Sequence, residues 1–125
     1  ESCSAFLSEM ALLTNLDAEA ETAPAALDGV RLSTVHQAKG LEWKAVFVIW
    51  LNEGLFPSSK SVEQIGGESE ERRLFYVAIT RAEDRLFLCA PQVRRKHDGG
   101  VIFYEPSQFI REIPPHLLKQ DGGFF

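Results

Sequence analysis

The spacing of apolar residues divides the first third of the chain into a helix, a linker, a strand and a loop. Apolar side chains recur at helical intervals over residues 4–16. Residues 17–28 are rich in Ala, Glu and Thr, which is typical of a linker. Alternation of apolar and polar residues over 30–35 predicts a strand, and the polar stretch 36–44, with a glycine at its centre, predicts a loop.

An apolar run and an amphipathic helix follow in the middle of the chain. Residues 45–51 are apolar at every position, as expected of a strand covered on both faces of a sheet. After a long loop over 52–67, Ser69 is suited to cap a helix with an acidic first turn, and residues 85–90 predict another strand. The stripe of this helix that we expect to be buried consists of Leu74, Val77 and Ala78.

The last third is predicted to consist of short elements separated by turns. A basic trio at 94–96 precedes a turn at 98–100, and residues 101–104 predict a short strand. A proline favours the start of a helix over 106–110, and the prolines at 114–115 stop it. Strands separated by a helix and long loops predict an α/β fold with a mostly parallel sheet.

Composition narrows the class of protein. The 125 residues suit one small domain, and 45% apolar with 25% charged residues is typical of a globular chain. The longest apolar run, 45–51, is far shorter than the roughly 20 residues of a membrane-spanning helix, so no membrane partner is expected. Cys3 and Cys89 suggest neither a disulfide framework nor a metal pair, and a reducing, cytoplasmic setting is expected.

Charge is distributed unevenly along the chain. The net charge of −5 alone argues against a nucleic-acid partner. Residues 1–28, however, hold six acidic and no basic side chains, which leaves 13 basic against 12 acidic side chains over 29–125. Local contacts to phosphate therefore remain possible, without a broad positive field.

Several common catalytic motifs are missing from these residues. The sequence contains neither a G-x-x-x-x-G-K-[ST] phosphate loop nor a G-x-G-x-x-G turn. The apolar run is followed by Asn52 where a magnesium-binding strand would present aspartate, which argues against such a site. No metal site is predicted, because the histidines lack Cys or acidic partners at ligand spacing: His36, His97 and His116.

Two segments carry unusual clusters of polar chemistry. Residues 32–43 read Leu-Ser-Thr-Val-His-Gln-Ala-Lys-Gly-Leu-Glu-Trp, and residues 70–82 read Glu-Glu-Arg-Arg-Leu-Phe-Tyr-Val-Ala-Ile-Thr-Arg-Ala. Together they resemble motifs V and VI of the UvrD, PcrA and Rep group of superfamily one DNA helicases. Asn-Glu-Gly-Leu-Phe-Pro at 52–57 and Pro-Ser-Gln-Phe-Ile at 106–110 follow in the family's order. The departures are mild: Gln37 for Ser or Ala, Trp43 for Phe, and Ala78 for Gly.

The resemblance implies a particular place in a larger protein. Residues 29–113 would be the C-terminal half of the second RecA-like motor domain, a P-loop NTPase-like helicase domain that here lacks the P-loop. Residues 1–28 would be the end of the subdomain inserted into it and a linker, and 114–125 a tail. The partners would include the first motor domain and the N-terminal half of the second.

The resemblance also implies a catalytic residue. The counterpart of Arg81 is an arginine finger that reaches the γ-phosphate of ATP, where a guanidinium neutralises charge as the phosphate leaves. The alternative for Arg81 is a surface arginine favoured by the dipole at a helix C-terminus.

Nucleotide and DNA contacts are implied for the first segment. Glu42 is similar to a residue that contacts the nucleotide, and Lys39 and Gly40 shape the same loop. The alternative is that Glu42 and Lys44 simply solvate a turn, and the same alternative applies to Lys39. His36 and Thr34 match positions on the path of single-stranded DNA, where a hydroxyl or imidazole can bind phosphate or sugar. A purely structural histidine is the alternative.

Three further features have weaker functional interpretations. Trp43 and Phe56 could stack on bases, but core packing is the preferred interpretation of both. The basic trio 94–96 could touch DNA phosphates, and a solvated loop is the preferred interpretation.

The implied function is the C-terminal segment of an ATP-dependent 3'-to-5' DNA helicase acting in DNA repair or replication on single-stranded and duplex DNA. ATP with Mg²⁺ would be bound by the intact enzyme, and this segment alone would bind no cofactor and have no ATPase activity. The alternatives are a non-catalytic DNA-binding or protein-interaction module, and a helicase-like subunit of a helicase-nuclease complex.

Overall fold

The computed structural model describes residues 28–121. The chain divides into two units, residues 1–32 and 33–125. The described part of the first unit has no helix or strand. The helix predicted over 4–16, and nearly all of the predicted linker, lie outside the described residues.

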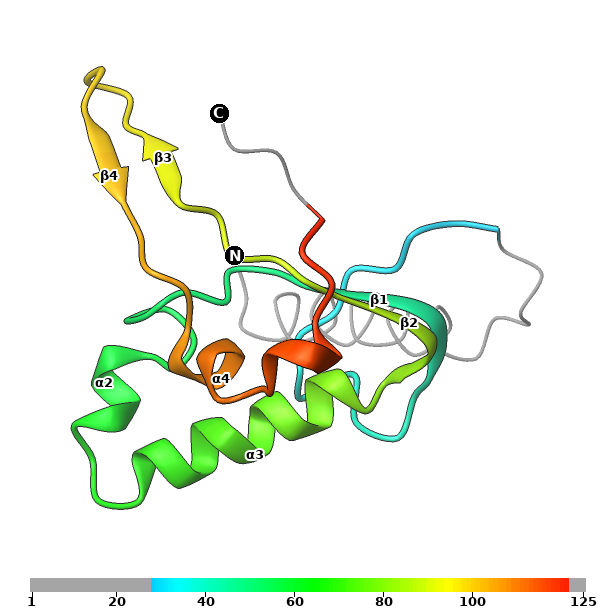
Figure 1. Ribbon diagram of the computed structural model, residues 1–125. Helices are drawn as coiled ribbons and strands as arrows, with labels where there is room; N and C mark the ends of the chain where they lie inside the picture. Colours follow the sequence, from blue (N-terminus) through cyan, green and yellow to red (C-terminus); the bar gives the residue numbers. More distant parts are fainter. Residues whose placement is uncertain (1–27, 122–125) are drawn as a thin grey trace, which may run out of the picture. The chain divides into compact units, whose positions relative to one another are not determined.

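Over its described residues, 33–121, the second unit contains four strands and several helices (Figure 1). No helix within residues 28–121 has the length and apolar character needed to cross a membrane. In chain order the elements are β1 (Trp43–Val48), α2 (Ser59–Val62), α3 (Gly67–Ile79), β2 (Ala82–Leu88), β3 (Val93–Arg95), β4 (Val101–Phe103), α4 (Gln108–Arg111) and the 3-10 turn η1 (Pro115–Leu117).

Strands β1 and β2 form a parallel pair, which confirms the parallel sheet predicted from the sequence. Val46 lies opposite Leu86, and Val48 opposite Leu88. Parallel neighbours need a crossover connection, and α2 and α3 lie within it. Strand β2 begins at Ala82, shortly after α3 ends at Ile79.

Strand β1 is covered on one face only by the described residues, so the prediction of two covered faces is wrong. Val48 is 8% exposed and faces the core, whereas Phe47 and Ile49 are 62% and 52% exposed. Phe47 instead stacks on Phe87 of β2, with ring centroids 4.3 Å apart. An uninterrupted apolar run does not show how many faces of a strand are covered, because both faces have the same composition.

The strand predicted over 30–35 is also absent. Residues 30–34 have no regular structure, and turns occupy 35–40. The backbone here bonds locally, since the Ala38 amide donates to the Thr34 carbonyl at 3.0 Å. No strand within residues 28–121 pairs with this segment. Alternation alone is therefore insufficient to form a strand without a neighbour.

Helix α3 begins two residues before its predicted cap. Gly66, with a φ of 76°, adopts the left-handed region, and the helix starts at Gly67. A Cβ on Gly67 would lie 1.6 Å from the carbonyl oxygen of Ser61, so only glycine fits this approach of α2 to α3. Ser69 lies inside the first turn, and its predicted role as the cap is wrong.

The buried face of α3 centres on Phe75 and Ala78, which are 7% and 5% exposed. The burial of Ala78 agrees with the sequence pattern, whereas Leu74 and Val77 are only half-buried. The burial of Phe75 is not predicted by that pattern, because the ring that covers it, Phe109, comes from α4 near the end of the chain.

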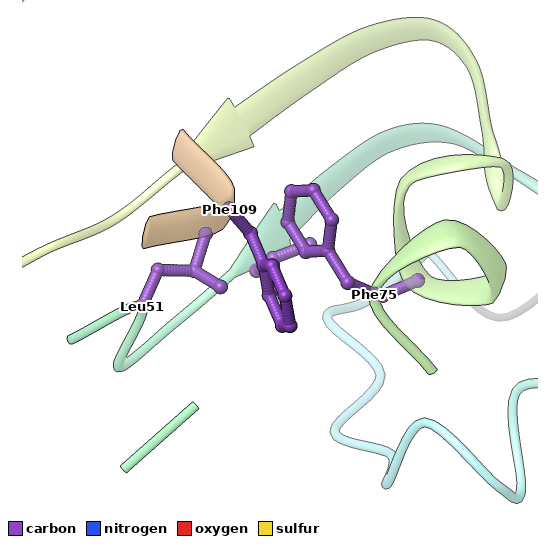
Figure 2. Packing of buried hydrophobic residues seen from close by; sticks show 5 residues of the cluster. Leu51, Phe75 and Phe109 are labelled. Atoms are coloured by element: carbon purple, nitrogen blue, oxygen red, sulfur yellow. The ribbon is translucent and has the colours of Figure 1, made fainter. Parts of the chain in front are cut away.

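The core joins β1, α3 and α4 (Figure 2). The rings of Phe75 and Phe109 stack with centroids 5.2 Å apart, and Phe56 meets each of them edge-on at 6.1 Å. Such pairs contribute about 0.5–1.5 kcal/mol each beyond the burial of their area. The buried members of the cluster are Val48, Leu51, Phe75, Ala78 and Phe109.

Helix α4 begins at Gln108, slightly later than the predicted range 106–110. Ser107 caps it, because its side-chain oxygen accepts a hydrogen bond from the Phe109 amide at 3.2 Å. The carboxylate of Glu53 accepts another from the amide of Gln108. These contacts fix α4, and with it Phe109, against the loop that follows β1.

A second, antiparallel pair of strands projects as a hairpin (Figure 1). The strand predicted over 101–104 is confirmed as β4. Its partner β3 contains Arg94 and Arg95, for which a loop was the preferred interpretation. Because β3 has only three residues and all of them are exposed, it has no apolar pattern from which a strand could be predicted.

Candidate functional site

The two segments singled out in the sequence meet at Arg81. The loop over 34–42 leads into β1, and α3 ends just before Arg81. The amide of Trp43 donates to the carbonyl oxygen of Arg81 at 2.9 Å, and Arg81 Nη1 donates to the carbonyl oxygen of Leu41 at 3.1 Å. Backbone and side chain of Arg81 thus both hold the end of the loop.

The guanidinium of Arg81 is anchored at the C-terminal end of α3. Its Nε donates to the carbonyl oxygen of Val77 at 3.1 Å, and its Nη2 donates to Thr80 Oγ1 at 3.2 Å. Carbonyls of the last helical turn lack partners within a helix, and a cation there also complements the helix dipole. The side chain is half-buried. The alternative derived from the sequence, a dipole-favoured arginine, therefore describes part of its environment.

The loop is shaped by a reciprocal pair of hydrogen bonds. The Gln37 amide donates to Thr34 Oγ1 at 3.2 Å, and the Thr34 amide donates to Gln37 Oε1 at 3.3 Å. This is the capping-box arrangement, which fixes the start of a helical turn. Gly40 ends the turn with a φ of 83°, a conformation that favours glycine. Gly40 therefore determines the backbone path at the end of this turn.

The remaining predicted site residues are exposed on this loop. His36, Lys39 and Glu42 are all exposed, and within residues 28–121 none of their side chains has a hydrogen-bond or ion-pair partner. The structure brings Arg81 against the backbone between Gly40 and Glu42, while His36 lies on the earlier turn. The side chains of His36, Lys39 and Glu42 are therefore accessible to a ligand.

Sequence reasoning missed three groups of this site. Gln37 carries a recognisable signal, because Thr followed three residues later by Gln is a capping-box pattern. The Thr80 hydroxyl and the Leu41 carbonyl carry none, since their importance depends on where the Arg81 guanidinium lies.

Two other features now have structural roles. Phe56 packs against Phe75 and Phe109, which confirms core packing as its preferred interpretation. Arg94 lies on exposed β3, with its guanidinium 5.9 Å from the centre of the Trp50 ring. Within residues 28–121 no three His, Cys, Asp or Glu side chains gather as a metal site.

Comparison with known proteins identifies the family. The UvrD-like helicase C-terminal domain family matches residues 1–92. The chain belongs to this family. The match includes the loop, α3 and Arg81, so the resemblance noted in the sequence is confirmed for the segments that form the site.

Relatives in this family are similar over nearly the whole chain. The chain is 41% identical over 116 residues to DNA helicase II of Escherichia coli, covering 93% of this chain and 15% of that protein. It is 42% identical over 117 residues to the ATP-dependent DNA helicase PcrA of Bacillus subtilis, covering 92% and 16%. It is 46% identical over 115 residues to PcrA of Leuconostoc citreum, covering 91% and 15%. The chain thus spans about a sixth of the length of these relatives.

Proposed function

We propose that this chain is the C-terminal part of an ATP-dependent DNA helicase that moves 3'-to-5' on single-stranded DNA in repair or replication. Residues 29–113 are the C-terminal half of its second RecA-like motor domain, preceded over 1–28 by the end of an inserted subdomain and followed by a tail. The relatives named as DNA helicases support this proposal. The observation that supports it most strongly is the contact of Arg81 with the loop over 34–42, because this contact joins the two candidate ligand-binding segments.

Arg81 is the catalytic residue in this proposal. A guanidinium has five N–H groups, and three of those of Arg81 bind Val77, Thr80 and Leu41. One N–H on each terminal nitrogen remains without an acceptor among residues 28–121, and these two can bind oxygens of the γ-phosphate. Such fingers contribute on the order of 10³ to 10⁵ in rate.

The rest of the nucleotide is contacted from the loop. Glu42 binds the nucleotide through its exposed carboxylate, while Gly40 and Lys39 shape the approach. Mg²⁺ belongs with ATP in the intact protein. Asn52 does not fit a magnesium ligand, because it is fully buried and its amide donates to the carbonyl oxygens of Pro91 and Glu105. The phosphate loop and the magnesium-binding acid are therefore assigned to other parts of the protein.

The same loop contacts DNA. His36 is exposed and available for phosphate or sugar, and the Thr34 hydroxyl can still donate while it accepts from the Gln37 amide. Nucleotide contacts at one end of the loop and DNA contacts at the other couple ATP binding to the grip on DNA through closure of the two motor domains.

Substitution of Arg81 in the complete protein tests this proposal. Arg81→Ala should lower DNA-stimulated ATP hydrolysis by about 10³-fold or more, with ATP binding retained. Arg73→Ala is the matched control, because Arg73 is an exposed arginine of α3 that pairs only with Glu70 among the described residues, and it should leave the rate unchanged. An unchanged rate in Arg81→Ala would remove the catalytic assignment.

A further inference from the structure

The hydroxyl of Thr80 joins the end of α3 to the Arg81 guanidinium. Thr80 is the C-cap residue of the helix. Its Oγ1 lies 2.9 Å from the carbonyl oxygen of Tyr76 and 3.0 Å from that of Val77. The single O–H is shared between these two acceptors. The same oxygen accepts from Arg81 Nη2 at 3.2 Å. A threonine hydroxyl can donate and accept at once, so these contacts are compatible.

We propose that Thr80 is a positioning residue for the Arg81 finger, an inference that rests on the proposed function. The Val77 carbonyl holds Nε, the Leu41 carbonyl holds Nη1 and the Thr80 hydroxyl holds Nη2. One N–H on each nitrogen of the guanidinium is therefore anchored, and three anchors fix the plane of the group.

Anchoring matters because an arginine side chain is otherwise flexible. A free arginine side chain populates many rotamers, and a guanidinium already oriented loses less freedom when phosphate binds. The Val77 and Leu41 anchors are backbone carbonyls, present whatever the side chains at those positions. Thr80 supplies the one anchor that depends on a side chain, so it is the anchor that a substitution can remove.

The direct test compares Thr80→Val with Thr80→Ser in the complete protein. Valine keeps the shape of threonine without the hydroxyl, and serine keeps the hydroxyl. Thr80→Val should lower kcat for DNA-stimulated ATP hydrolysis on the order of 10- to 100-fold, because a hydrogen bond to a charged group and the orientation it provides are lost. The KM for ATP should stay the same, and Thr80→Ser should retain most of the rate.

A second readout separates positioning from a general structural role. Binding of ADP with aluminium fluoride, which mimics the phosphate in transfer, should weaken in Thr80→Val by the same factor as kcat. Binding of ADP alone should not change, because ADP lacks the group that Arg81 contacts. In a double-mutant cycle on this affinity, Thr80→Val should add nothing to Arg81→Ala, since Thr80 acts only through the Arg81 guanidinium.

The outcomes distinguish the two proposals. If Arg81→Ala is inactive but Thr80→Val has the wild-type kcat, the positioning role is wrong and the proposed function stands. Equal weakening of both nucleotide complexes, or additive losses in the cycle, would also overturn the positioning role. If Thr80→Val does not fold, Thr80→Ala carries the same test. An active Arg81→Ala would overturn both proposals.

Discussion

Replacing Asn52 with aspartate should destabilise the chain, because its buried side-chain amide donates to two backbone carbonyl oxygens. Asn52 is 0% exposed at the start of the loop after β1. Its Nδ2 donates to the carbonyl oxygen of Pro91 at 2.8 Å and to that of Glu105 at 3.2 Å. This amide therefore ties together three segments, which lead from β1, from β2 and into α4.

The size of the effect follows from these two bonds. A carboxylate cannot donate, so Asn52→Asp leaves both carbonyl oxygens without this donor and turns a negative charge toward them. The Glu105 carbonyl keeps the Glu53 amide as a donor at 3.1 Å, so the Pro91 carbonyl is the group left unsatisfied. This costs about 1–3 kcal/mol in the free energy of unfolding at neutral pH, and burial of the new charge adds to the loss. Gln92→Glu introduces the same charge at an exposed position and should cost under about 0.5 kcal/mol.

The loss should depend on pH with a definite sign. Burial and the two facing carbonyl oxygens raise the pKa of the new carboxyl group above its unfolded value of about 3.9. Its protonated form can donate one of the lost bonds, so the Asn52→Asp variant should be least destabilised below that pH and lose stability as pH rises through the folded pKa.

The assay is urea-induced unfolding of the 125-residue chain followed by tryptophan fluorescence. The chain's two tryptophans report on β1, because Trp43 is its first residue and Trp50 follows its end. An Asn52→Asp variant within about 0.5 kcal/mol of wild type at neutral pH would show that the hydrogen bonds of the Asn52 amide do not stabilise the fold. A stability loss that is the same at acidic and neutral pH would contradict the predicted pH dependence.

Three further predictions concern the core, the loop over 34–42 and the Cys89 thiol. Phe109→Ala should cost about 3–5 kcal/mol in urea unfolding, against little for the exposed Phe103→Ala; similar losses would contradict the packing described. Gln37→Ala should weaken single-stranded DNA binding by the complete protein about two- to fivefold, the equivalent of roughly 0.5–1 kcal/mol for a lost cap, and unchanged binding would exclude the capping box as a positioning device. Burial raises the pKa of the Cys89 thiol, so its alkylation at neutral pH should be slower in the folded chain than in urea and should accelerate as pH rises. The rate at Cys89 is measured by peptide mass analysis, and equal rates for the folded and the urea-unfolded chain would contradict this.

Elements whose pattern is local can be predicted from this sequence. The helical periodicity of α3, the apolar runs of β1 and β2 and the proline before α4 each lie within one segment. What such patterns miss is contact between distant segments. The two partners of Asn52 lie 39 and 53 residues further along the chain, and no local pattern indicates that its amide is buried between them.

The same contrast between local patterns and long-range contacts applies to the candidate site. Arg81 and the loop stand out because the two motifs are local and specific. The carbonyl that holds Arg81 Nη1 comes from Leu41, 40 residues earlier, and is a backbone group that any residue could supply. Thr80 is adjacent to Arg81 in sequence, yet its role depends on a guanidinium folded back over the end of α3. Sequence therefore indicates Arg81 as the candidate side chain but not the groups that hold it.

The role of Arg81 is best examined in a structure of the complete protein bound to single-stranded DNA and a non-hydrolysable ATP analogue. We predict that the Arg81 guanidinium lies within about 2.7–2.9 Å of a γ-phosphate oxygen, as charge-assisted hydrogen bonds require. A guanidinium directed into bulk solvent, with the γ-phosphate contacted only by other residues, would contradict the account.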